Sequence, residues 1–207
     1  MSNTPRAVIF DVGKVLYDWS PRLLYERLIG DDQALEAFLR DVVTIEWHFQ
    51  HDAGRPFAET SAELIAQFPE HEALIAAWGP RFNESIGAPI DGMHELVAEL
   101  DAAGVPLYAI TNFSGEFWKP FRASEAPLFD RFRDVVVSGD EKLMKPDAAI
   151  YRLALDRFGL EPHEAVFVDD NRDNVAGAAG VGMAAIHFSD ADALRQELAA
   201  LGLPVAA

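Results

Sequence analysis

The fold of this chain is decided near its start, where residues 7–13 read Ala7-Val8-Ile9-Phe10-Asp11-Val12-Gly13. Four consecutive apolar residues that stop at an aspartate are typical of a strand buried on both faces, because a strand with one solvated face would alternate apolar and polar residues. Similar short apolar runs recur along the chain, at Val105–Ile110, Val135–Val137, Ala165–Val168 and Met183–Ile186. The pattern predicts a parallel β-sheet in an α/β fold.

Segments with apolar residues at helical spacing lie between these runs. Three of them are followed by a glycine, which often ends a helix: Gly92–Ala103, Asp147–Phe158 and Asn174–Ala179. Such segments are the crossover helices that join parallel strands.

The connection between the first two predicted strands is far too long for a single crossover helix. Helical spacing there predicts four helices, at Pro21–Ile29, Gln33–Gln50, Phe57–Phe68 and Glu70–Asn83. We therefore predict a core of residues 1–15 and 89–207, with a four-helix insertion of residues 16–88 after the first strand.

The composition excludes several classes of protein. The 207 residues include no cysteine, which excludes disulfide frameworks, thiolate metal sites and a cysteine nucleophile. There are 17 Lys and Arg against 34 Asp and Glu, and the net charge of −17 argues against a nucleic-acid partner. The longest uncharged apolar stretch, Val175–Ile186, is well short of the ~20 residues that cross a bilayer. Because no signal peptide fits the N-terminus either, we expect a cytoplasmic monomer or homodimer without a membrane partner.

Polar residues follow the predicted strands where a parallel sheet binds its ligands, beyond the carboxyl ends. In chain order they are Asp11, Thr111-Asn112, Lys145-Pro146 and Asp169-Asp170. Taken singly, each has a simpler interpretation, as a helix cap, a surface lysine or a turn. Asn171 or Asp173, for example, is expected to cap the next helix. The ordered recurrence at strand ends favours a single site.

These residue types suit phosphoryl transfer. Asp11 is a candidate nucleophile, but three neighbouring carboxylates repel one another unless a cation lies among them. Carboxylate and carbonyl oxygens are the ligands that Mg²⁺ prefers. Thr111 as a hydrogen-bond donor and Lys145 as a fixed cation would stabilise the transferring phosphoryl group. The set predicts a magnesium-dependent reaction through an aspartyl-phosphate.

Four segments resemble the four motifs of the haloacid dehalogenase superfamily of hydrolases, namely Val8–Gly13, Ile110–Asn112, Lys145-Pro146 and Val166–Asn171. The resemblance covers nearly the whole chain and implies a Rossmann-like core with a helical cap inserted after the first strand. It also implies Asp11 as nucleophile, Thr111 and Lys145 as partners of the nucleophile and phosphate, and Asp169 and Asp170 as magnesium ligands. We add Asn112, beside Thr111, to the candidate catalytic residues.

The first motif, with Asp18-Trp19 and residues 46–54, looks most like the capped branch that contains sugar-phosphate phosphatases such as the glucose-1-phosphate phosphatases. One position departs from the superfamily's phosphatase pattern, in which a second aspartate follows two residues after the nucleophile as general acid and base. This chain has Gly13 there, which offers a magnesium ion only its backbone carbonyl. Loss of a general acid costs roughly 10²- to 10⁴-fold in rate, and Asp18 or a cap histidine is the candidate replacement.

Substrate choice is expected to lie with the insertion and with the loop after the first strand. The candidate substrate-binding residues are Gly13, Lys14, Trp47, His48 and His51. Trp47 combines stacking area with a neighbouring histidine, although it also fits a packed cap interior. The i, i+3 spacing of His48 and His51 is compatible with a zinc site, but two histidines without further ligands predict packing or substrate contact instead.

The sequence thus predicts a magnesium-dependent hydrolase of a small phosphorylated metabolite, with a sugar phosphate implied by the resemblance. One alternative is a 2-haloacid dehalogenase that uses Asp11 without metal, which the acidic pair Asp169-Asp170 disfavours. Another is a catalytically weak binding or regulatory relative, which Gly13 keeps open. A signalling receiver domain is disfavoured because it carries the acidic pair after the first strand and lacks a cap.

Overall fold

The computed structural model describes residues 4–205. Its centre is a five-stranded sheet with the order β5-β4-β1-β6-β7, in which all neighbouring strands are parallel. The strands are β1 (Ala7–Phe10), β4 (Leu107–Thr111), β5 (Asp134–Val137), β6 (Ala165–Asp169) and β7 (Ala184–His187). The predicted α/β fold with a parallel sheet is confirmed. The strand order reverses beside β1, and open α/β sheets bind ligands at such a point.

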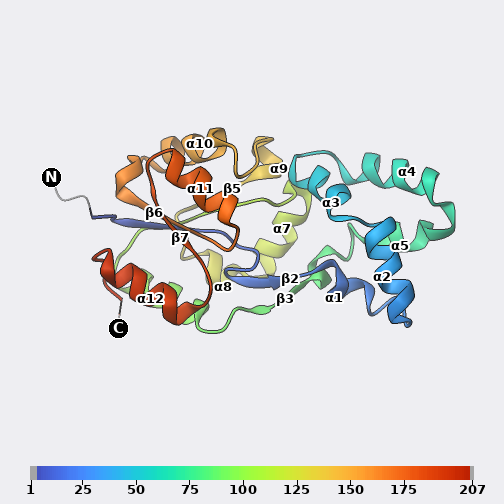
Figure 1. The fold of residues 1–207 in the computed structure, drawn as a ribbon, viewed down its shortest axis with the longest axis horizontal. Helices are drawn as coiled ribbons and strands as arrows, with labels where there is room; N and C mark the ends of the chain where they lie inside the picture. Colours follow the sequence, from blue (N-terminus) through green and yellow to red (C-terminus); the bar gives the residue numbers. More distant parts are fainter. Residues whose placement is uncertain (1–3, 206–207) are drawn as a thin grey trace.

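Helices cover both faces of this sheet (Figure 1). Alternate residues of β1 face opposite sides, with Ala7 and Ile9 in one buried cluster and Val8 and Phe10 in the other. One face packs on α10 (Ala148–Phe158) and α11 (Arg172–Gly180), and the other on α6 (Met93–Ala102) and α12 (Ala191–Ala200). Burial on both faces is the physical reason that the strands appear as continuous apolar runs in the sequence.

Several elements of the core were not evident from the sequence pattern. They are α7 (Gly115–Ser124), α8 (Ala126–Phe129), α9 (Ser138–Glu141) and α12. The first of these contains Pro120 in its interior, and the next two have only four residues each, so propensity and periodicity are weak guides there.

The insertion begins and ends as a small antiparallel pair of strands, β2 (Tyr17–Trp19) and β3 (Ile86–Pro89). Between them lie α1 (Pro21–Tyr25), α2 (Asp32–Asp41), α3 (Ile45–Asp52), α4 (Phe57–Gln67) and α5 (Glu72–Ala77), with short 3₁₀ turns at Pro69–His71 and Phe82–Ser85. Figure 1 shows α1 to α5 gathered at the end of the molecule away from both termini.

The predicted single helix Gln33–Gln50 is two helices. The break falls at Val42 and Val43, both buried, and Thr44 begins α3 by accepting a hydrogen bond from the Trp47 amide through Oγ1 at 3.1 Å. Helical spacing continues across the break and hides it, whereas the cap residue marks it. The three-residue strand β2 is too short to show any periodicity.

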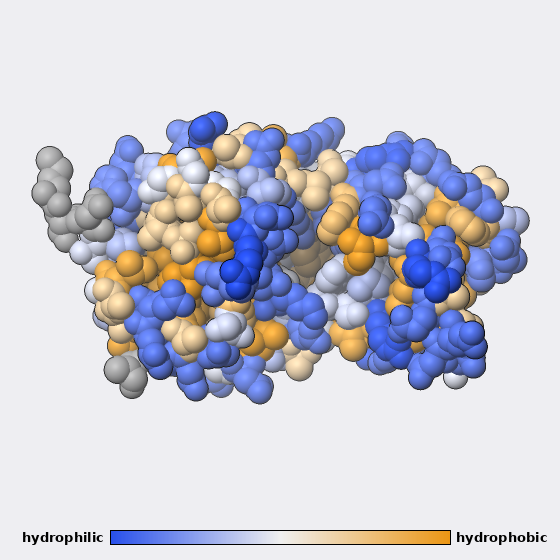
Figure 2. All heavy atoms as spheres, viewed as in Figure 1, coloured by the Kyte–Doolittle hydropathy of each residue, from blue (hydrophilic) through white to orange (hydrophobic). Residues whose placement is uncertain are grey.

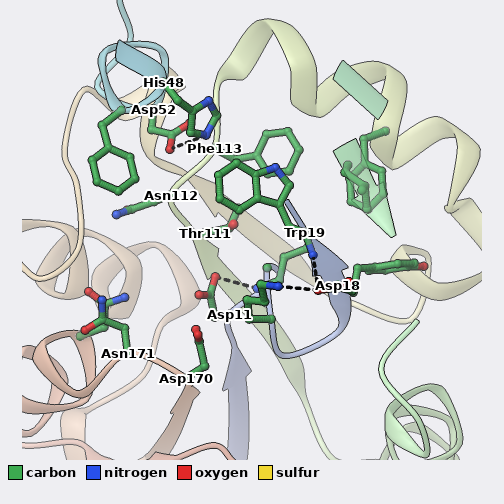
Figure 3. Close-up of a pocket in the computed structure, with 18 of the residues that line it drawn as sticks. Asp11, Asp18, Trp19, His48, Asp52, Thr111, Asn112, Phe113, Asp170 and Asn171 are labelled. Carbon is green, nitrogen blue, oxygen red and sulfur yellow. Dashed lines mark hydrogen bonds and ion pairs between the residues drawn. The ribbon is translucent and has the colours of Figure 1, made fainter. Parts of the chain in front are cut away.

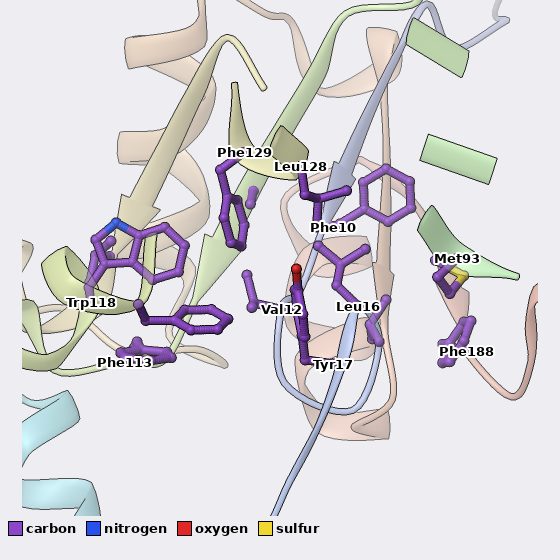
Figure 4. Packing of buried hydrophobic residues seen from close by; sticks show 14 of the residues in the cluster. Phe10, Val12, Leu16, Tyr17, Met93, Phe113, Trp118, Leu128, Phe129 and Phe188 are labelled. Carbon is purple, nitrogen blue, oxygen red and sulfur yellow. The ribbon is translucent and has the colours of Figure 1, made fainter. Parts of the chain in front are cut away.

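A largely aromatic cluster packs against the sheet (Figure 4) and continues into the insertion. Phe113, just beyond β4, packs on Trp118 of α7 with ring centroids 5.4 Å apart. Phe113 also meets Phe82 of the insertion at 5.2 Å, and Phe82 stacks on Phe117 at 4.6 Å. The insertion therefore packs on the core through large rings.

Among residues 4–205, no helix has the length and apolar character needed to span a bilayer.

Candidate active site

The predicted catalytic residues lie together at the carboxyl ends of the central strands. Asp11 follows β1, Thr111 ends β4 and Asp169 ends β6, while Lys145 enters from the loop before α10. All four side chains are buried. Parallel strands bring their carboxyl ends to the same sheet edge, so residues 158 positions apart in the chain become neighbours.

Lys145 joins two of the carboxylates. Its Nζ lies 2.8 Å from Oδ1 of Asp11 and 2.7 Å from Oδ2 of Asp169, and the residue is only 3% exposed. Burial by itself lowers the pKa of Lys145, but the charges of Asp11 and Asp169 outweigh it and raise the pKa above its ordinary value. Lys145 is therefore a permanent cation at the floor of the site, rather than the solvated lysine that its position alone would suggest.

Asn112 holds the backbone of Lys145. Its amide Nδ2 donates to the Lys145 carbonyl at 3.0 Å, and its Oδ1 accepts from the Lys145 amide at 2.9 Å. Asn112 also lines the cavity. The two-point contact shows that Asn112 positions Lys145 from the end of the neighbouring strand, and its direct role in catalysis stays a prediction.

Asp169 is surrounded by donors. Besides Lys145, the Asn171 amide donates to Oδ1 at 2.8 Å, and Nδ2 of Asn174 lies 3.1 Å from both oxygens. Asn174 was not among the predicted site residues, because an asparagine in the first turns of a helix has no distinguishing pattern. Asn171 is the N-cap of α11, as expected, and accepts from the Asp173 amide. The hydrogen bonds fix the Asp169 carboxylate and leave Asp170 facing the cavity (Figure 3).

Three acidic side chains lie close enough together to share a metal ion: Asp11, Asp169 and Asp170. Their ligand oxygens, one from each residue, all lie within 4.8 Å of one another. Within residues 4–205 no other group of three or more His or acidic residues does so. Lys145 balances one of the three negative charges, so a divalent cation would neutralise the other two. Burial raises the pKa of Asp11, with Lys145 opposing this effect and Asp169 adding to it. Burial and then Asp169 also raise the pKa of Asp170. This donor set of hard oxygens fits Mg²⁺.

A cavity of about 220 Å³ opens above this floor, between the sheet edge and the insertion. Thr111, Gly13 and Lys14 all line it. The Lys14 ammonium is 2.5 Å from Oδ1 of Asp18, and this hydrogen bond lowers the pKa of Asp18. Asp18 is thus held in its ionised form, which does not suit the predicted role of proton donor.

The three insertion residues predicted to bind substrate, Trp47, His48 and His51, lie in different surroundings. His48 lines the cavity, with Nε2 3.3 Å from Oδ2 of Asp52. Trp47 does not line the cavity: it is 6% exposed, donates from Nε1 to the Thr60 carbonyl at 3.2 Å and packs among other rings of the insertion. The structure therefore corrects the prediction that Trp47 contacts substrate.

His51 is also absent from the cavity lining. It is fully buried, its Nε2 is 2.6 Å from Oγ1 of Thr60, and burial lowers its pKa to about 3. At i, i+3 on α3 the two imidazoles lie on the same side of the helix, with centroids 6.0 Å apart. His51 packs against Phe57 and Phe117, whereas His48 packs against Trp19 and Phe82. No zinc site forms from this pair within the described chain, since the only candidate metal cluster there is the aspartate trio.

Comparison with known proteins decides the family. The family model of haloacid dehalogenase-like hydrolases matches residues 5–182. The chain belongs to this family. It is 30% identical to the sesquiterpene phosphatase astK of Aspergillus oryzae, over 96% of this chain and 97% of that protein. It is 28% identical to the N-acetylmuramic acid 6-phosphate phosphatase of Pseudomonas aeruginosa, over 88% of this chain and 82% of that protein.

Solved structures agree with the fold of this haloacid dehalogenase-like hydrolase. A family enzyme from Bacteroides thetaiotaomicron, solved as a magnesium complex, superposes with a TM-score of 0.69 over 90% of this chain and 94% of that one. The two sequences are 19% identical, so this likeness supports the fold. The prediction of a hydrolase with phosphatase relatives is confirmed.

Proposed function

We propose that this hydrolase is a magnesium-dependent phosphomonoesterase that works through a phosphorylated Asp11. The observation that carries the proposal is the buried cluster of Asp11, Lys145 and Asp169, which opens through Asp170 into a cavity large enough for a small ester. Residues 16–88 act in this proposal as a cap that covers the reacting phosphate.

The geometry supports attack by the Asp11 carboxylate on phosphorus. A P–O bond forms to Asp11 while the ester P–O bond breaks; the ester oxygen leaves with the electron pair of that bond and takes a proton from solvent water to become the alcohol. Water then attacks the acyl phosphate, which releases inorganic phosphate and restores the carboxylate. The Lys145 ammonium and the Thr111 hydroxyl are placed to stabilise charge on the phosphoryl oxygens.

Asp11, Asp170 and the Gly13 carbonyl would hold the magnesium ion. When bound, the ion supplies positive charge that neutralises the carboxylates and the phosphate. Asp169, predicted from the sequence as a direct ligand, already accepts hydrogen bonds from three residues and serves in this proposal to fix Lys145 and the start of α11. The excess negative charge of the cluster favours this reaction over metal-free displacement of halide.

The family likeness alone does not choose the alcohol. The two named relatives are phosphatases of a sesquiterpene and of a sugar phosphate, so they represent an apolar and a polar substrate. The sugar phosphate implied by the sequence resemblance is one member of the wider class of small phosphomonoesters to which we assign the substrate.

Release of inorganic phosphate from methyl phosphate and p-nitrophenyl phosphate tests the proposal, measured with MgCl₂ and after EDTA treatment. We expect release that requires the metal, and labelled enzyme after acid quenching of a reaction with a ³²P-labelled ester. A parallel assay follows chloride release from 2-chloropropionate. Metal-independent chloride release, or no phosphate release from either ester, would overturn the proposal.

A further inference from the structure

The polar side chains of the cavity divide into two sets. One set lies on the floor, around Asp11. The insertion and the loop that leads into it contribute the other set. It includes two pairs whose members contact each other, Lys14 with Asp18 at 2.5 Å and His48 with Asp52 at 3.3 Å, and Tyr17, whose hydroxyl donates to Glu125 at 2.7 Å. Nδ1 of His48 and Oδ1 of Asp52 have no hydrogen-bond partner, but both atoms are buried from solvent. A substrate rich in hydroxyl groups would have to move or break these pairs, or bury hydroxyls without partners, and each costs binding energy.

The remaining wall above the floor is apolar and mostly aromatic. Its members are Trp19, Phe49, Phe82, Ile86, Phe113 and Phe121. Several of these rings are in contact, with centroids 5.2 Å apart for Phe82 and Phe113 and 5.7 Å for Phe113 and Phe121. In the view of Figure 3, the rings of Trp19 and Phe113 lie between Asp11 and the pair of His48 with Asp52. The leaving group of a bound ester therefore meets rings.

Phe49 supplies an independent observation. This residue is 45% exposed. Within residues 4–205, the only other large hydrophobic residue that is exposed is Ile45, at 39%. Phe49 also lines the cavity, whereas Ile45, one helical turn earlier on α3, does not. Figure 2 shows hydrophobic surface along the insertion side of the hollow in the middle of the molecule. A ring left in water at the mouth of a cavity is stabilised when an apolar ligand covers it.

We propose that the cavity accepts the phosphate monoester of a largely apolar alcohol, an alkyl, alkenyl or aryl phosphate, with its hydrocarbon part against the aromatic wall and Phe49. This inference rests on the proposed phosphomonoesterase function and names its substrate class. It replaces the sugar phosphate that the sequence resemblance implied, because Lys14 is paired with Asp18 and His48 with Asp52, and the unpartnered atoms of the second pair are buried from solvent.

The test compares hexyl phosphate with glucose 6-phosphate, since both are esters of primary alcohols with six carbons and differ chiefly in hydroxyl groups. We expect kcat/KM to be at least about 30-fold higher for hexyl phosphate, the effect of burying a few methylene groups. Phe49→Ala is expected to lower the ratio of kcat/KM for hexyl phosphate to that for methyl phosphate about 10-fold. Ile45→Ala is the matched control, on the same helix and similarly exposed, and is expected to leave this ratio unchanged.

Calorimetric binding of hexylphosphonate and methylphosphonate, with Mg²⁺ present, gives a measurement that needs no turnover. We expect hexylphosphonate to bind at least about 30-fold more tightly and Phe49→Ala to remove most of the difference. If no ester is hydrolysed, the proposed function fails, and the two binding constants still decide the inference. Equal binding of the two phosphonates, or a glucose 6-phosphate reaction as fast as that of hexyl phosphate, would overturn the apolar substrate class.

Discussion

The floor and the roof of the cavity are built in opposite ways. On the floor, strand ends hold buried charges in a network in which Lys145 and Asp169 each contact several partners. The opposite wall, which we call the roof, comes mainly from the insertion and presents aromatic rings with two side-chain pairs, Lys14 with Asp18 and His48 with Asp52. In the function that we propose, the core carries out the reaction on phosphorus and the insertion selects the alcohol. Each half can then be altered separately.

The largest effect is expected on the floor, from Asp11→Asn. The amide keeps the shape of the side chain but is not a usable nucleophile, so kcat should fall at least about 10⁴-fold. Phosphate release from methyl phosphate measures the loss, and thermal melting checks that the protein remains folded. Asp156→Asn, an exposed carboxylate of α10, is the matched control. Activity of Asp11→Asn within tenfold of the unaltered protein would remove Asp11 from the reaction.

Lys145→Met should affect both reaction and stability. It removes the charge between Asp11 and Asp169, and breaking a buried ion pair costs about 3 to 5 kcal/mol of unfolding free energy. Loss of a cation that stabilises the phosphoryl oxygens should lower kcat about 10²- to 10³-fold. Urea unfolding and steady-state kinetics measure the two effects. Unchanged stability would show that the three groups do not interact as the distances imply.

On the roof side, Trp47→Ala should change stability without changing substrate preference. The cavity left by a buried indole costs about 3 to 5 kcal/mol. Because Trp47 does not line the substrate cavity, the ratio of kcat/KM for hexyl phosphate to that for methyl phosphate should stay constant. Trp19→Ala, at a tryptophan that does line the cavity, is the comparison variant and should lower that ratio. A changed ratio in Trp47→Ala, with little loss of melting temperature, would return Trp47 to the substrate site.

The smallest expected effect separates the two neighbouring aspartates. Asp170→Asn should weaken Mg²⁺ binding about 10- to 100-fold, because it removes a charged oxygen ligand that faces the cavity. It should leave melting without metal nearly unchanged. Asp169→Asn should instead lower the melting temperature without metal, since Lys145 loses a buried partner. Magnesium titrations of activity and metal-free melting curves measure both variants. Identical behaviour of the two would contradict the different roles.

The sequence was most informative where a residue's environment is set by its neighbours in the chain. The first and last residues of each observed strand of the sheet lie within two residues of the predicted ones. The reason is that burial on both faces produces a local apolar run. Asp11, Thr111 and Asp169 could be found because each follows such a run. Asn174 could not, since its importance comes only from the two oxygens of Asp169 that it contacts.

The insertion was harder to interpret. Trp47, His48 and His51 are similar candidates in the sequence, yet one packs among rings, one lines the cavity and one binds Thr60. Which face of a helix meets a cavity depends on how that helix packs against others, and helical spacing shows the faces without showing their surroundings.

The sequence by itself determined the α/β class, because apolar runs are local features. The same runs, and the residues that end them, also predicted an inserted segment and a charged site at the strand ends. Only the tertiary structure decided that Asn112 holds Lys145, that Asp18 is paired with Lys14, and that the roof is largely aromatic. Those facts depend on contacts between residues far apart in the chain. They are fixed only when the insertion packs against the sheet.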